Sequence, residues 1–226
     1  MRSRFFWLVG MRLFAAGSIA ALIFTCLMPG SGEREFQKTL DAMKNVHTFR
    51  ALMTTNPGTQ LNDFLWEVDC DQQIMHKVTH NVDTRVDPPL DQTQDEIRVG
   101  HHLYTKQIDG SWKQSMGAPP KYYCDKIAAG ADSGIMPKIA TMLKKGIIQK
   151  GEKKTVNGVR CREWDVASRN GLPNIEHATV CIGLDDHLPY ELTLDWARSR
   201  TTFSDYNTQI SFDLPDAALQ PASATN

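Results

Sequence analysis

The sequence lacks the residue patterns of the common catalytic, metal and cofactor sites. It contains no Cys-x-x-Cys pair and no cysteine–histidine cluster with the spacing of a zinc site. Asp185, Asp186 and His187 resemble part of a catalytic set, but they fall at an expected turn before Pro189. No serine nucleophile lies in a glycine elbow, and no general acid–base pair stands out. We therefore expect no enzyme, no metal and no cofactor.

The histidines offer no metal site either. His76 and His80 are four residues apart, a spacing that chelates a metal only on a helix. On the strand expected here, residues four apart lie about 13 Å from each other, too far to share one ion. His101 and His102 fall at an expected hairpin tip. All four histidines are expected to be solvated.

The chain has no basic excess. It carries 25 Lys and Arg against 26 Asp and Glu, a formal net charge of −1. Residues 1–32 hold three arginines and no acid, so the remainder is more acidic, at about −4. We therefore expect no nucleic-acid partner, because no basic face is available to neutralise phosphates.

Residues 1–32 have the pattern of an export signal. Arg2, Arg4 and Arg12 accompany an uninterrupted run of apolar or small residues that ends at Met28. Gly30-Ser31-Gly32 then supplies small residues at which a signal peptidase would cut. We expect an exported protein of the periplasm or cell envelope.

Two alternatives to cleavage stay open. Residues 5–28 are long enough to remain as a membrane anchor if Arg12 lies near the interface. Cys26 is a conceivable lipidation site, but Ile23-Phe24-Thr25-Cys26 departs from a lipobox, which has a small residue before the cysteine. Cleavage is preferred over the anchor, and the anchor over lipidation.

Four cysteines follow the leader, and export suggests that they form two disulfides. In a hairpin centred near Gly171, residues whose numbers sum to about 342 lie opposite each other, which pairs Cys161 with Cys181. Cys70 is then left with Cys124. Strand alternation places Cys161 and Cys181 on the face opposite Trp164, so this disulfide is expected on the outer surface of the sheet.

Alternation with a period of two dominates the chain. From Tyr190 to Trp196, apolar side chains fall on one face of an expected strand, while Glu191, Thr193 and Asp195 fall on the other. The expected layout is a helix, a meander of antiparallel strands, a helical insertion and a second meander. No repeat or linker is present, so residues 33–215 form one α+β domain, followed by a flexible tail at 216–226.

Several elements are predicted individually. The first helix is expected over Glu33–Asn45, and the insertion contains helices over Tyr122–Ala129 and Ile135–Lys145. Val82–Gln94 is polar and contains two prolines, which predicts a loop, and Gln209–Phe212 is expected to be a short last strand. A large antiparallel sheet with one apolar face must cover that face, and amphipathic helices do so while leaving room for a pocket.

The chain resembles the LolA/LolB-type lipoprotein-carrier superfamily, which includes the LppX/LprG-like lipoproteins. The resemblance covers residues 36–214 and is carried by short segments: Phe36–Asn45 followed by Val46-His47-Thr48-Phe49-Arg50, Gly110-Ser111-Trp112, Val156-Asn157-Gly158-Val159-Arg160-Cys161, and Phe203-Ser204-Asp205-Tyr206-Asn207 before Phe212-Asp213-Leu214-Pro215. It implies a single curved antiparallel sheet, an unclosed half-barrel with helices covering its concave face. It also implies an apolar cavity for acyl chains and an early arginine, here Arg50, that pins the helical cover.

The function expected from this resemblance is that of an exported carrier or sensor of a lipid or lipoprotein acyl chain. The alternative is an envelope protein–protein interaction module with the same fold and a filled core. Aromatic and aliphatic side chains that would line the cavity, and that would otherwise be ordinary core residues, are Phe64, Trp66, Met142, Trp164, Tyr190, Leu192, Leu194 and Trp196.

Overall fold

The computed structural model describes residues 31–56, 60–118, 146–168 and 177–219 of the chain. Within these ranges, eleven strands form one antiparallel sheet, preceded by a 13-residue helix. The elements are α2 (Ser31–Met43), β1 (Thr48–Thr55), β2 (Gln60–Asp69), β3 (Ile74–Asp83), β4 (Leu90–Val99), β5 (His102–Lys106), β6 (Trp112–Met116), β7 (Gly146–Val156), β8 (Val159–Ser168), β9 (His177–Gly183), β10 (Pro189–Leu194), the 3₁₀ turn η1 (Asp195–Ala197), β11 (Ser199–Ser204) and α5 (Asp216–Leu219).

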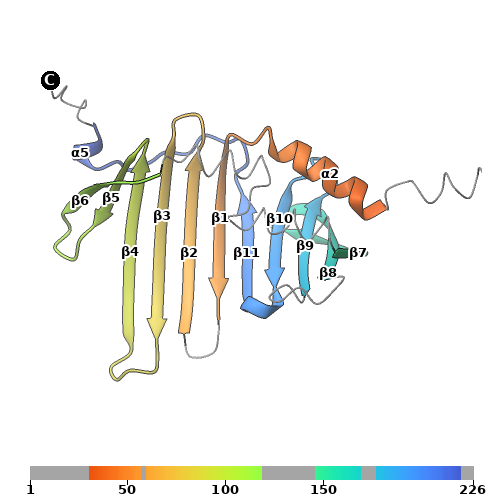
Figure 1. Ribbon diagram of the computed structural model, residues 1–226, viewed down its shortest axis with the longest axis horizontal. Coiled ribbons are helices and arrows are strands. Elements are labelled where there is room, and N and C mark those ends of the chain that lie inside the picture. Colours follow the sequence, from red (N-terminus) through yellow and green to blue (C-terminus); the bar gives the residue numbers. More distant parts are fainter. Residues whose placement is uncertain (1–30, 57–59, 119–145, 169–176, 220–226) are drawn as a thin grey trace, which may run out of the picture.

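Two meanders make up the sheet, and they meet at its centre (Figure 1). The strand order is β6-β5-β4-β3-β2-β1-β11-β10-β9-β8-β7. β1 pairs with β11 antiparallel, with Arg50 opposite Ser204 and Thr55 opposite Ser199. Within the described ranges β6 and β7 are the edges, and they do not pair with each other. The predicted antiparallel sheet that does not close into a barrel is therefore confirmed.

The tight turns follow from the sequence. Asn157 and Gly158 join β7 to β8 with φ values of 49° and 81°, and Val156 lies opposite Val159. Positive φ at both central residues defines the two-residue hairpin turn that matches strand twist, and Asn-Gly is its favoured sequence.

The predicted loop at Val82–Gln94 is wrong. β3 extends to Asp83 and β4 begins at Leu90, and these two residues are the last pair of the β3–β4 ladder. The connection is only residues 84–89. The first half of β4 is exposed, so its side chains are polar although its backbone is fully paired in the sheet. Hydrophobic alternation does not reveal this part of the strand, because neither of its faces is buried.

The last predicted strand, Gln209–Phe212, is also wrong. This segment is irregular and is held beside the start of β1 by specific bonds. The backbone N–H of Asn207 donates to the carbonyl oxygen of Thr48 at 3.0 Å, and the Thr48 hydroxyl donates to the carbonyl oxygen of Thr208 at 2.6 Å. Ile210 is buried. Its apolar side chain therefore reflects packing rather than strand alternation.

Helix α2 packs on the end of the sheet that holds β8 to β10 (Figure 1). It begins at Ser31, two residues before the predicted start, and Gly32 is already buried against Ile148 and Trp164. Phe36 and Met43, seven residues apart on one helical face, are buried as well. The other two predicted helices, Tyr122–Ala129 and Ile135–Lys145, lie outside the described residues.

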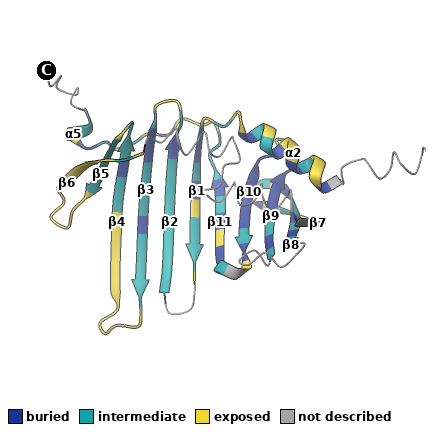
Figure 2. Ribbon diagram, in the orientation of Figure 1, coloured by how far each residue is buried: buried dark blue, intermediate teal, exposed yellow. Residues whose placement is uncertain are grey.

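Burial is uneven along the sheet (Figure 2). The main core cluster lies on the sheet face that α2 covers, and its buried members are Phe36, Phe49, Ala51, Val68, Met75, Trp164, Val166, Ala178, Val180, Ile182, Leu192, Leu194 and Phe203. β9 and β10 are mostly buried, whereas the first eight residues of β2 and the last four of β3 are intermediate. The half of the sheet away from α2 is therefore incompletely covered.

The disulfide Cys161–Cys181 forms as predicted, with a Cα–Cα distance of 5.5 Å. The ladder is offset from the predicted one, because Cys161 lies opposite Gly183 and Cys181 opposite Glu163. The bond therefore joins diagonal neighbours. It shares its face with Glu163, but both cysteines are buried in a second cluster, with Met43, Val156, Leu188 and Tyr190. The expected position on the outer surface is wrong. Cys70 is also disulfide-bonded, and its predicted partner Cys124 lies outside the described residues.

Candidate functional site

Phe64 and Trp66 form a stacked aromatic pair in the middle of β2. Their ring centroids lie 5.5 Å apart, and their planes differ by 11°. Both side chains are only partly buried, and both have the strand parity of Val68, which belongs to the main core cluster. The pair is therefore an apolar surface on the core-bearing face, in a part of the sheet that α2 does not cover.

The neighbouring strands extend this surface and give it a polar border. Met53 of β1 lies opposite Phe64 and is partly exposed. On β3, Lys77 lies opposite Trp66, and its ammonium group is 3.6 Å from a carboxylate oxygen of Glu96 on β4. We call Met53, Phe64 and Trp66 the aromatic patch. An apolar surface with few polar groups at its margin suits an apolar ligand with a polar end.

Three other predicted residues are buried in the core. Trp164, Leu192 and Leu194 belong to the main core cluster, with exposed fractions of 4%, 1% and 8%. The Trp164 ring meets Phe36 of α2 edge-on. Its indole N–H is buried and has no hydrogen-bond partner among the described residues. A buried donor without a partner is costly, so this group is suited to a carbonyl acceptor.

Tyr190 lies apart from Leu192 and Leu194. The β9–β10 ladder shifts register between Pro189 and Glu191, and Tyr190 packs in the cluster of the Cys161–Cys181 disulfide. Its hydroxyl donates to Asp186 at 2.6 Å. Burial raises the pKa of Tyr190, and the bond to Asp186 raises it further. The strict alternation predicted from Tyr190 onward is therefore broken by a bulge.

The strand also ends earlier than predicted. β10 stops at Leu194, and Trp196 lies in the turn η1. Its side chain is outside what the structure describes, as is the whole of Met142. The structure thus brings Phe64 and Trp66 together, groups Trp164 with Leu192 and Leu194, and separates Tyr190.

The opposite face of the sheet carries a charged network that the sequence did not predict. Arg50 donates to Glu67 at 2.6 Å and to Asp205 at 3.0 Å. Burial alone would raise the pKa of Glu67, but bonds from His76 and Arg50 more than offset this, so the pKa lies below its ordinary value. The described partners of Arg50 are strand and loop residues. They give no support to its predicted role in holding the helical cover.

His76 is part of the same network, so its predicted solvation is wrong. Its two ring nitrogens lie 2.8 Å from Glu67 and 2.9 Å from Asp95. These carboxylates come from β2 and β4, which flank β3, so only the strand pairing reveals the contact. His80 similarly lies 2.8 Å from Asp91. Within the described ranges, no group of histidine, cysteine and acidic side chains could hold a metal ion.

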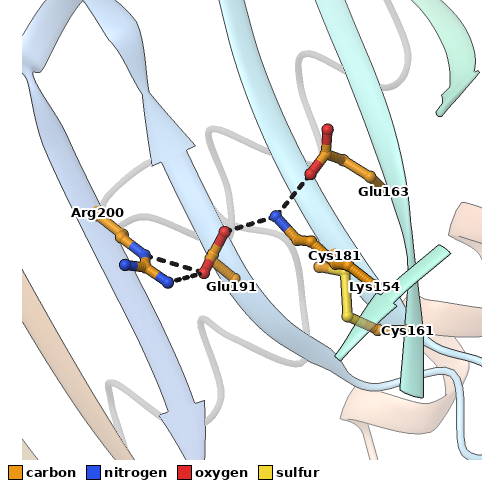
Figure 3. The surroundings of a disulfide bond; sticks show 6 residues. All are labelled: Lys154, Cys161, Glu163, Cys181, Glu191 and Arg200. Atoms are coloured by element: carbon orange, nitrogen blue, oxygen red, sulfur yellow. Dashed lines mark hydrogen bonds and ion pairs between the residues drawn. A yellow bond between two sulfur atoms is a disulfide. The ribbon is translucent and has the colours of Figure 1, made fainter. Parts of the chain in front are cut away.

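A second network surrounds Glu191 above the disulfide (Figure 3). Glu191 is buried, and its carboxylate accepts bonds from Lys154 at 2.7 Å and from Arg200. Lys154 also contacts Glu163. Burial would raise the pKa of Glu191, but the two cations more than offset this and hold it below its ordinary value. The prediction of a wet face for Glu191 is wrong, because long basic side chains cover it.

No family model matches the chain, and the search of curated proteins finds no match. Solved structures do match its fold. The lipoprotein LppX of Mycobacterium tuberculosis aligns over 82% of this chain and 100% of its own, with 14% identity and a TM-score of 0.54. LprF of Mycobacterium bovis aligns over 81% of this chain and 96% of its own, with 12% identity and a TM-score of 0.57. The predicted LppX-like fold is therefore confirmed.

Among the described residues, no helix is long and apolar enough to cross a membrane. The leader, with its apolar run at residues 5–28, lies outside them except for Ser31 and Gly32, which belong to α2.

Proposed function

We propose that the protein is an exported, non-enzymatic carrier or sensor that holds an acyl chain of a lipid or lipoprotein against the core-bearing face of its sheet. The observation that carries this proposal is the aromatic patch. Phe64 and Trp66 stack on each other on that face, yet they stay only partly buried. The main core cluster is buried, so an apolar ligand would add burial at this partly exposed patch beside it.

The driving force is the transfer of apolar surface from water, at roughly 25 cal/mol per Å². A hydrocarbon chain lying on Met53, Phe64 and Trp66 would cover surface on all three side chains. The ion pair of Lys77 and Glu96 at the margin would keep the polar end of the ligand in water. Specificity for chain length would then depend on the extent of the covered face.

Trp164 adds a polar contact to the proposal. Its buried indole N–H lacks a protein acceptor among the described residues, and it lies in the same core cluster as Trp66. The carbonyl oxygen of an acyl ester or amide would satisfy this donor. A free alkane would not, so Trp164 would favour acylated ligands.

The proposed cover includes α2 and the helices predicted at Tyr122–Ala129 and Ile135–Lys145, with Met142 against the ligand. Met suits such a position because its side chain adapts to irregular apolar shapes. This arrangement belongs to the proposal, as do the domain limits at 33–215 and the tail at 216–226.

The predicted leader and the disulfides support an exported location. Disulfides such as Cys161–Cys181 and the one formed by Cys70 persist in oxidising environments. The fold is one that a mycobacterial protein described as a lipoprotein also has. We propose cleavage within the small residues before Glu33, with retention of residues 5–28 or lipidation of Cys26 as the alternatives.

Native mass spectrometry of protein purified from its own host, followed by lipid extraction, tests the proposal. We expect a bound species that contains an acyl chain and that is lost when Trp66 is replaced by a small residue. Protein that is folded, fully recovered and free of lipid would end the carrier hypothesis.

The second candidate is an envelope interaction module, and one observation favours it. Within the described residues β6 is an edge strand, four of its five residues are exposed, and Met116 is 72% exposed. A partner strand adding to this edge would extend the sheet. Lipid-free protein with a stable envelope partner that is lost on substituting Met116 would support this function instead.

A further inference from the structure

Strands β7 and β8 carry four basic side chains on the core-bearing face: Lys150, Lys153, Arg160 and Arg162. The ladder places Lys150 opposite Trp164, Lys153 opposite Arg162 and Thr155 opposite Arg160, which sets all four on the same side. Lys150, Lys153 and Arg160 are exposed. None of the four forms an ion pair with a described residue, and Arg162 donates only to the carbonyl oxygen of Gly151. We call these four residues the basic surface.

The start of α2 lies beside the basic surface. A Cβ atom at Gly32 would come within 2.5 Å of Ile148 and 3.5 Å of Trp164, so the first turn of α2 lies directly on β7 and β8. The apolar run of the leader ends at Met28, three residues before Ser31. Three residues span at most about 10 Å, so a retained anchor would hold this edge of the sheet at the bilayer surface.

Acidic and basic side chains are concentrated on different parts of the sheet, with the basic excess at the edge beside the start of α2. Residues 60–99, on β2 to β4, carry nine acidic and three basic side chains, whereas residues 146–168 carry five basic and three acidic ones. The near-neutral total of the chain conceals this difference. Opposite charges on separate parts of a protein orient it in an external field, here that of an anionic surface.

We infer that the basic surface docks on the anionic phospholipid headgroups of the membrane to which the protein is delivered or anchored. Phosphate oxygens are acceptors for the free donors of Lys150, Lys153 and Arg160. Two exposed acids weaken the attraction without reversing it. Glu152 precedes Lys153 in the sequence, and Asp185 follows Leu184, whose backbone N–H donates to the carbonyl oxygen of Arg160 at 3.1 Å. Docking by this surface turns the core-bearing face, with its aromatic patch, toward the source of acyl chains. The inference goes beyond acyl-chain binding and stands without it.

Acetylation of lysines, read by mass spectrometry, tests the inference on the full chain in vesicles. The chain is reconstituted in phosphatidylcholine vesicles with and without phosphatidylglycerol, so that any anchor is present in both. We expect Lys150 and Lys153 to react about five-fold more slowly in the anionic vesicles, the factor equivalent to about 1 kcal/mol per basic side chain near such a surface. High salt should remove the difference, because it screens exposed charges.

Lys113 is the internal control, since it is exposed on β6 at the opposite edge of the sheet. Its reaction should be the same in both vesicles. Arg160→Glu should reduce the protection of Lys150 and Lys153, whereas the matched Lys113→Glu should leave it unchanged, with unfolding midpoints confirming that both variants fold. Equal reaction of Lys150 and Lys153 in the two vesicles, or equal protection of Lys113, would overturn the inference.

Discussion

Phe36 of α2 meets Trp164 of β8 edge-on, with ring centroids 6.1 Å apart and an interplanar angle of 63°. Both side chains are almost completely buried. This contact joins the helix to the strand next to the sheet edge, and with Gly32 and Met43 it fixes α2 along its whole length. The helix is thus an integral part of the core.

Replacing Phe36 by alanine should lower the free energy of unfolding by about 3 to 5 kcal/mol, because it leaves a cavity beneath α2. Urea denaturation followed by tryptophan fluorescence measures this loss. Gln37→Ala, one residue along on the exposed side of the helix, should change stability by about 0.5 kcal/mol or less. Equal effects of the two substitutions would show that α2 does not pack as described.

Loss of the Cys161–Cys181 disulfide should cost about 3 kcal/mol, the value expected when a loop of 20 residues is no longer closed. The double substitution to alanine measures it by thermal or chemical unfolding. Reduction of the wild-type protein should have at least as large an effect, because it also opens the disulfide of Cys70. A double variant as stable as the wild type would contradict the structural role of this bond.

Acid should destabilise the protein partly through Glu191. Its pKa in the folded state is lowered, so the unfolded chain takes up the proton first as the pH falls below the ordinary value of 4.5. The contribution of Glu191 is complete above that pH and is lost as the pH falls through the lower folded-state pKa. Unfolding free energies from pH 7 downward should therefore fall less steeply for Glu191→Gln than for the wild type.

At neutral pH the same substitution should cost about 1 to 3 kcal/mol, because Lys154 and Arg200 lose a buried charged acceptor. Asp213→Asn, which changes an exposed carboxylate, is the matched control and should have little effect at either pH. If both variants followed the same pH curve, Glu191 would not be the responsible group.

Acyl-chain binding should depend on alternate residues of β2. Phe64→Ala and Trp66→Ala should each weaken the binding of a fluorescent fatty acid by about ten-fold, equivalent to the loss of about 1.4 kcal/mol of apolar contact. Leu65→Ala is the matched control, because Leu65 lies between them and points to the other face. Unchanged binding in both aromatic variants, or an equal loss with Leu65→Ala, would place the ligand elsewhere.

Local sequence signals predicted the elements well where one face is buried. The first helix, predicted over Glu33–Asn45, is observed over Ser31–Met43, and the Asn157-Gly158 turn lies where its backbone preference places it. The pairing of Cys161 with Cys181 was also correct, since the two residues lie only two positions out of register and their Cα atoms are 5.5 Å apart. These features depend on neighbours in the sequence or within one hairpin.

Features that depend on several strands were not predictable. The bonds of Arg50 to Glu67 and Asp205 join residues from three separate segments, and His76 gains its partners only through the β2–β3–β4 register. Burial of Glu191 requires basic side chains from β7 and β11. A charged residue in an alternating strand signals a wet face unless its partners are known, and one sequence does not supply them.

The pairing of β1 with β11 has a consequence for how the chain is completed. The two strands at the centre of the sheet are the first and last to be synthesised, since Arg50 lies opposite Ser204. β1 cannot pair with β11 until β11 has left the ribosome. Pairing these two strands then carries the entropy cost of closing a very long loop. A stop codon before Ser199 would therefore split the sheet through its middle rather than shorten it, and the emerging chain cannot complete its sheet until β11 is made.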